Sequence, residues 1–159
     1  MDSEHLREKA EAHRTKSSEL SEEAERLSSE RARLLKKAGN LSYKAKNSAV
    51  MRDECSREAA KAEELTEAWR EKRKNRARMD AADLTGEDRQ IVMHSQTSKS
   101  MRSKEKKAES DRIRFEREAE ACRTKAEDLK RKIAQLRKDS SKEYELYIGC
   151  AKILSEKEN

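Results

Sequence analysis

The chain has 159 residues, and 45% of them are charged, with 39 basic and 33 acidic side chains giving a net charge of +6. So high a charged fraction leaves too few apolar residues for a conventional globular core. Two classes of protein remain, namely disordered chains and long helices that need only a narrow apolar stripe. Proline is absent and glycine occurs only three times, so we favour helices and expect an all-α protein without strands.

The first predicted helix begins at Asp2 or Ser3, because either side chain can cap the first backbone N–H groups. Leucine dominates one of its two seam registers and small residues dominate the other, which is the heptad pattern of helices wound on partner helices. The seam has no missed step and consists of Leu6, Ala10, His13, Ser17, Leu20, Ala24, Leu27, Arg31, Leu34, Ala38, Leu41, Ala45 and Ser48.

Gly39-Asn40 resembles a helix stop. The seam keeps its register across this dipeptide, whereas a loop would normally reset it. We therefore expect the helix to continue, at a cost of about 1 kcal/mol for the glycine relative to alanine. A kink or a break at this point is the alternative.

The same register continues with weaker residues to Trp69 and then meets Arg73 and Arg76. A straight helix with 3.6 residues per turn gradually outruns a seven-residue seam. We therefore expect the apolar positions to shift by one beyond these arginines, to Ala77, Ala81 and Leu84.

The strongest break in the chain is the segment 83–88, where Thr85 can cap a new helix and Asp88 can complete a capping box. Gly86 would relieve backbone strain there. We predict a first arm at about 2–84, a turn at 85–87 and a second arm at about 88–139, which together form a long antiparallel helical hairpin, or coiled coil.

A turn at Gly86 would place residue i opposite roughly residue 172 − i in an antiparallel hairpin. The strong seam of 20–45 should then face about 127–152. The second arm carries its own firm seam, at Phe115, Ala119, Cys122, Ala126, Leu129, Ile133, Leu136 and Ser140.

Asp139-Ser140-Ser141 predicts a cap for a separate final helix at 140–157. Its segment 144–154 is the least polar stretch of the chain, and its apolar residues surround the helix. A helix of this kind needs cover on more than one side.

We therefore expect one elongated coiled-coil unit, 1–159, that packs into a helical bundle as an oligomer. Its partner would be a second copy or another coiled-coil protein. The self-association seam would comprise Leu6, Leu20, Leu27, Leu34, Leu41, Phe115, Leu129, Ile133, Leu136, Tyr147, Ile148 and Leu154.

Basic residues are concentrated at 70–78 and 99–107, and the predicted hairpin would bring both groups to the turn end as one basic tip. Such a tip attracts polyanions, either nucleic acid or an acidic protein surface; a solvated helix face is the alternative. The candidates are Arg70, Lys72, Arg73, Lys74, Arg76, Arg78, Lys99, Arg102, Lys104, Lys106 and Lys107. The segment KRKNRAR is also a weak match to a nuclear localisation signal.

The chain lacks the spacings that metal sites and catalytic sites require. His5, His13 and His94 lie far apart, and no phosphate-binding glycine loop is present. We therefore expect no enzyme and no cofactor. No apolar run approaches the roughly 20 residues of a membrane span, and the segment 144–154 has too little of a basic face to bind a membrane surface.

Three widely spaced cysteines do not form a disulfide framework and favour an intracellular, cytoplasmic location, with the nucleus as an alternative. Cys55 and Cys122 occupy seam positions, and Cys150 is the best candidate for an intermolecular disulfide. The sequence thus predicts a non-enzymatic structural or assembly protein, a scaffold, spacer or filament subunit. The alternative is a sequence-independent nucleic-acid-binding protein that uses the two basic groups.

Overall fold

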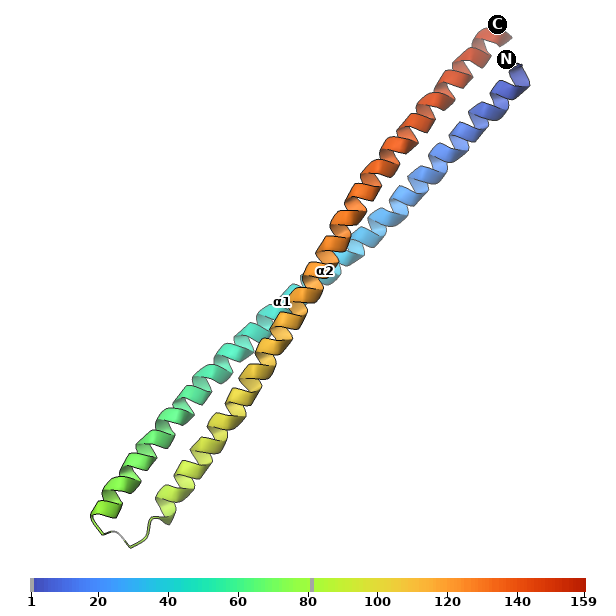
Figure 1. Cartoon of the computed structure of the whole chain (residues 1–159). Coiled ribbons are helices and arrows are strands. Elements are labelled where there is room, and N and C mark those ends of the chain that lie inside the picture. Colours follow the sequence, from blue (N-terminus) through green and yellow to red (C-terminus); the bar gives the residue numbers. More distant parts are fainter. Residues whose placement is uncertain (1, 81) are drawn as a thin grey trace. The chain divides into compact units, whose positions relative to one another are not determined.

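The computed structural model describes residues 2–80 and 82–159. It contains α1, Ser3–Arg78, with 76 residues, and α2, Thr85–Glu158, with 74 residues. No strand occurs in the described part of the chain. The two helices run side by side in opposite directions (Figure 1), which confirms the predicted all-α antiparallel hairpin.

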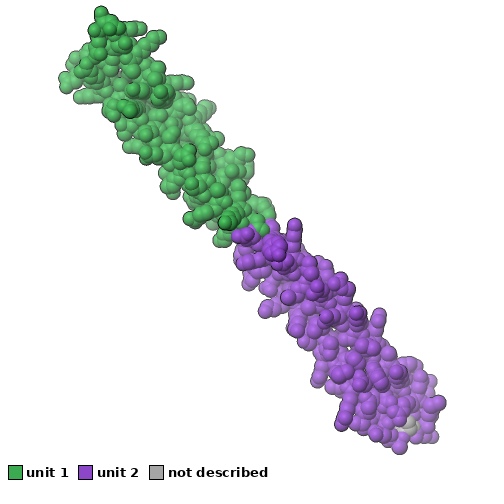
Figure 2. Space-filling model, turned by 180° about the vertical axis from the view of Figure 1, so that it is seen from behind, with its two compact units in different colours: residues 1–39, 119–159 green, residues 40–118 purple. Residues whose placement is uncertain are grey.

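The hairpin divides into two compact units (Figure 2). Unit 1 consists of residues 1–39 and 119–159, and unit 2 consists of residues 40–118. Each unit contains a part of α1 together with the part of α2 that pairs with it. α1 continues through Gly39 and Asn40, as the unbroken heptad register predicted.

The connection between the helices spans residues 79–84, not the predicted 85–87. The backbone N–H of Thr85 donates a hydrogen bond to Asp83 Oδ1 at 3.0 Å, so Asp83 supplies the cap that the sequence had suggested for Thr85. Thr85 and Gly86 therefore belong to the first turn of α2. The first arm ends at Arg78, earlier than the predicted boundary at 84.

This earlier turn changes which residues face each other. In unit 2 the numbers of paired residues add up to 161 for Arg52–Glu109, Glu63–Ser98 and Arg73–Asp88. The expected sum of 172 was wrong, because the chain reverses within 79–84. In unit 1 the buried pair Ser17–Ser140 adds up to 157. The segment 20–39 therefore faces about 118–137, which lies in the firm seam of α2, rather than the later segment predicted.

The predicted separate helix at 140–157 is also wrong, because α2 continues through this region to Glu158. Ser140 is buried, with 7% of its surface exposed. Its hydroxyl donates to the backbone carbonyl of Ser17 on α1 at 2.8 Å. A hydroxyl used in this way across the helix pair does not cap a new helix.

The expected one-residue shift of the seam is not seen in α1. Ala77 is exposed and Leu84 is half-buried in the connection, while Ala81 lies outside the described residues. Arg73 instead keeps its seam position, half-buried, and its guanidinium pairs with Asp88 of α2. An ion pair across the helices thus replaces apolar packing near the turn.

The apolar core is concentrated in unit 1. Ala24 is 2% exposed, Leu27 8% and Ile133 6%, and the three pack together with Leu129 and Leu136. Alanine at alternate seam positions leaves room for the leucine and isoleucine of the other helix. The small seam residues noted in the sequence therefore let α1 and α2 approach closely.

Candidate interaction surfaces

The predicted self-association seam is mostly buried between α1 and α2 of the same chain. Four of its residues are buried, namely Leu6, Leu27, Leu41 and Ile133. Seven are half-buried, namely Leu20, Leu34, Phe115, Leu129, Leu136, Tyr147 and Leu154. Only Ile148 is largely exposed, at 46%. The seam therefore holds the hairpin together, and outside contacts must use other surfaces or an opened hairpin.

A layer of serines interrupts the apolar seam in unit 1. The Ser17 hydroxyl donates to the Ser140 carbonyl at 3.0 Å, and the Oγ atoms of these two residues lie 3.1 Å apart. Ser21 Oγ lies 3.2 Å from Ser140 Oγ. A shift of one helix along the other would leave the buried hydroxyls of Ser17 and Ser140 without partners, at about 1–3 kcal/mol each. The layer therefore helps to fix the pairing register.

A polar pair lies next to the serine layer. His13 Nδ1 is 2.6 Å from Glu143 Oε2, and both side chains are about three-quarters buried or more. Lys16 Nζ lies 3.9 Å from the other oxygen of Glu143. Farther along, Arg7 near the start of α1 pairs with Glu158, the last residue of α2.

The seam of unit 2 is largely polar. Glu87 and Ser98 are buried in α2 at seam positions, and Thr66 is buried in α1. Sequence reasoning included Thr66 in the continued register of the first arm but missed Glu87 and Ser98, because it searched the second arm for apolar residues. The available signal was spacing alone, since steps of four and three lead from Glu87 through His94 and Ser98 to the seam that begins at Phe115.

Glu109 bridges two arginines in unit 2. Arg52 Nη1 of α1 donates to Glu109 Oε2 at 2.6 Å, and Arg112 Nε of α2 donates to the same oxygen at 2.9 Å. The hydrogen bonds from Arg112 and Arg52 lower the pKa of Glu109 to about 2. Sequence reasoning missed Glu109, because its pairing with Arg52 depends on the register between the helices.

Acid should weaken unit 2 through this carboxylate. The pKa of Glu109 is lower in the folded chain, at about 2, than in the unfolded chain, where it is about 4.3. Its stabilising contribution is therefore complete above about pH 4.3 and is lost as the pH falls toward 2. We expect Glu109→Gln to flatten this part of the stability curve, measured by urea unfolding at successive pH values. An unchanged pH dependence in the variant would contradict the assignment.

Two further groups of ion pairs lie nearer the turn. Arg102 donates to both Glu63 oxygens, at 2.9 and 3.0 Å, and to Glu105 at 2.8 Å. The buried Glu87 carboxylate accepts a hydrogen bond from Arg76, which lowers the pKa of Glu87. Ion pairs thus join α1 to α2 where apolar residues are scarce.

The two basic groups do not form one tip. Residues 70–78 lie beside the acidic start of α2, and 99–107 face about 54–62, so the groups are separated along unit 2. Four of the candidate arginines have acidic partners: Arg70 with Glu67, Arg73 with Asp88, Arg76 with Glu87 and Arg102 with Glu63. The error follows from the wrong turn position.

The remaining basic candidates are separate surface charges. Lys72 lies over the Trp69 ring, 4.4 Å from its centroid. The others are exposed, namely Lys74, Arg78, Lys99, Lys104, Lys106 and Lys107. Polyanion binding by these groups stays a prediction, without the concentrated tip that was its main support.

A cluster of exposed apolar side chains lies on the last part of α2, in unit 1. Tyr144 is 53% exposed, Leu146 51%, Ile148 46% and Ile153 45%. We call these four residues the C-terminal patch. The Tyr144 ring also packs against Tyr147, with the ring centroids 5.8 Å apart. Among the described residues, no other segment of ten positions exposes four large apolar side chains.

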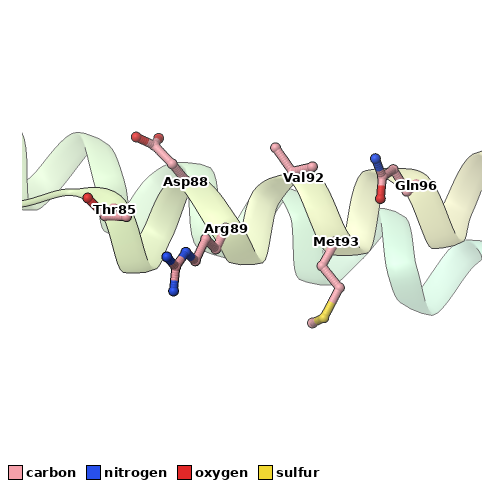
Figure 3. Close-up of a pocket in the computed structure, with 6 residues that line it drawn as sticks. All are labelled: Thr85, Asp88, Arg89, Val92, Met93 and Gln96. Carbon is pink, nitrogen blue, oxygen red and sulfur yellow. The ribbon is translucent and has the colours of Figure 1, made fainter.

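The surface also has a shallow concavity of about 370 Å³ at the start of α2. Figure 3 shows that all of its lining residues project from this one helix, with Asp88 and Val92 on one side and Arg89 and Met93 on the other. Ligand sites normally enclose most of their ligand. A concavity lined by a single helix does not meet that requirement.

Comparison with protein-family models, with curated proteins and with solved structures finds no match to this chain. Across residues 2–80 and 82–159, no three His, Cys, Asp or Glu side chains gather as ligands for a metal ion. Neither α1 nor α2 contains, in its described residues, a segment apolar enough to cross a membrane. The surfaces described above are therefore the basis for any functional assignment.

Proposed function

We propose that this protein is a non-enzymatic structural or assembly protein that works by binding a second copy of itself. A role as a scaffold, a spacer or a filament subunit in an intracellular complex fits this activity. The observation that supports the proposal is the C-terminal patch, which remains exposed after the seam has been used within the chain.

The patch lies on two sides of α2. Tyr144 and Ile148 flank the seam on one side, and Leu146 and Ile153 flank it on the other, because residues three to four and seven positions apart share a helix face. The hairpin leaves both sides open to solvent. A helix with apolar residues on several sides is usually covered by partners on more than one side.

A second copy suits this surface in charge as well as in apolarity. The residues in and next to the patch carry both signs, with Lys142 close to Glu145 and Lys152 close to Glu156. A strongly acidic or strongly basic partner would meet like charges, whereas a second copy presents the same mixture. Tyrosine is also enriched among the residues that dominate binding energy at interfaces.

The proposal is tested by removing one side of the patch. Tyr144→Ser combined with Ile148→Ser should weaken self-association at least tenfold, since interface anchors commonly contribute more than about 1 kcal/mol each. The quantity to measure is the dissociation constant of the dimer, by sedimentation equilibrium. Both residues are about half exposed, so the helicity of the hairpin should change little.

The matched control is Tyr43→Ser combined with Val50→Ser. These residues are 67% and 56% exposed, lie seven positions apart and belong to unit 2. The control should associate like the natural chain. Equal weakening in both variants, or no weakening in either, would refute the C-terminal patch as the contact.

A further inference from the structure

The connection between α1 and α2 contains neither glycine nor proline. In Met79-Asp80-Ala81-Ala82-Asp83-Leu84 the only residues typical of turns are the two aspartates. Asp80 has a φ of 54°, in the left-handed region, which aspartate tolerates better than most residues but at a higher cost than glycine. Alanine, methionine and leucine in this segment all favour helix.

The spacing of three and four residues also continues through this connection, with one irregular step. The seam positions on either side of it are Thr66, Trp69, Arg73, Arg76, Asp80, Leu84, Glu87, Ile91 and His94. Their steps alternate between three and four, except for two successive fours around Asp80. Such an insertion is a stutter, which an uninterrupted coiled-coil helix accommodates by local unwinding. A hairpin loop imposes no phase relation of this kind on its two helices.

We propose that two copies of this chain exchange arms, so that α1 of each copy pairs with α2 of the other and the helix continues from Arg78 into Thr85. The seam of each helix then packs against a helix of the second copy of the chain. This inference deepens the proposed self-association by adding a second way in which two copies combine, through the seam instead of the C-terminal patch.

The exchange preserves the pairs that hold each unit together. Ser17 of one copy meets Ser140 of the second copy, and Arg52 meets Glu109 of the second copy, because a two-fold axis through the connection reproduces the antiparallel register. The left-handed conformation of Asp80 is no longer needed. Association restricts the motion of two chains, so the exchanged dimer is favoured as the chain concentration rises.

A disulfide across the seam distinguishes the two arrangements. Ser17 Oγ and Ser140 Oγ are 3.1 Å apart, so the double variant Ser17→Cys, Ser140→Cys places two thiols together. The natural cysteines are removed by Cys55→Ala, Cys122→Ala and Cys150→Ala. The chain is refolded at low and at high concentration, oxidised and analysed on a denaturing gel without reductant, with circular dichroism as the check on folding.

Exchange predicts a covalent dimer whose share rises with the chain concentration during refolding. Covalent monomer alone at every concentration would overturn the exchange. If that monomer nevertheless sediments as a dimer, the copies associate as closed hairpins, and the proposed self-association stands without exchange. If only covalent monomer forms and this monomer does not associate, both the exchange and the proposed self-association are overturned. The failure of the exchange alone can therefore be distinguished from the failure of self-association.

A second pair of variants tests the exchange without any cysteine change. Asp80→Gly should favour the closed hairpin, because glycine adopts a positive φ without strain, and Asp80→Ala should favour exchange. The dimer dissociation constants of the two variants should differ by at least about fivefold, with the alanine variant tighter. Equal constants, or the reverse order, would overturn the inference even if the cysteine variant fails to fold.

Discussion

Ile133→Ala should lower the free energy of unfolding by about 2–4 kcal/mol, the range typical of buried isoleucine truncations. Ile133 is 6% exposed and packs against Ala24 and Leu27 in the apolar core of unit 1. Truncation leaves a cavity that neighbouring alanines cannot fill. Urea unfolding followed by circular dichroism measures the change, and the melting temperature should fall by about 5–15 °C.

The matched control for this prediction is Ile113→Ala. Ile113 is 37% exposed and lies outside the core cluster, so its truncation should cost about 1 kcal/mol or less. The large effect at Ile133 has a structural reason: long polar helices gain most of their stability from the buried stripe. Equal losses at the two isoleucines would contradict the burial on which the core assignment rests.

Ala59→Leu should destabilise the hairpin by about 1–3 kcal/mol through overpacking. Ala59 has 0% of its surface exposed and occupies a seam position in unit 2, where the two helices lie close together. Leucine has almost the same helix propensity as alanine, so the expected loss comes from the contact between helices. The measurement is again the free energy of unfolding in urea.

The adjacent alanine provides the control, since Ala60 is exposed on α1. Ala60→Leu should change the free energy of unfolding by no more than about 0.5 kcal/mol. A greater loss at Ala60 than at Ala59 would mean that the seam faces another side of α1. Similar small changes at both positions would mean that the helices do not approach closely here.

The hairpin and its seam could be predicted because both depend on spacing that the sequence displays directly. From Leu6 to Ser48 each seam position is buried or half-buried, as the alternation of three and four required. The same spacing showed that Gly39-Asn40 continues the helix. Local composition and periodicity are therefore sufficient to predict the fold class of a chain that has so few apolar residues.

The turn position could not be fixed in the same way. Asp83 and Thr85 are both good N-cap residues only two positions apart, and the hydrogen bond from Thr85 N–H to Asp83 decides between them. Locating the turn at Gly86 shifted the facing pairs of unit 2 by eleven positions. The expectation of a single basic tip followed from that error.

Ion pairs between the helices could not be predicted from the sequence either. Glu109 is one of many carboxylates in the sequence, and only the register brings it to Arg52. Ser140 illustrates the same limit, because a serine after an aspartate reads as a cap, whereas the structure buries its hydroxyl against Ser17. Residues whose role depends on the opposite helix require the three-dimensional pairing.

Self-association is tested most directly by sedimentation equilibrium of the natural chain over a wide range of concentrations. We expect the mass of one 18.4 kDa chain at the lowest concentrations and twice that mass as the concentration rises, with strong helicity throughout. A single-chain mass at every concentration would contradict the proposal that this protein acts by binding a second copy of itself.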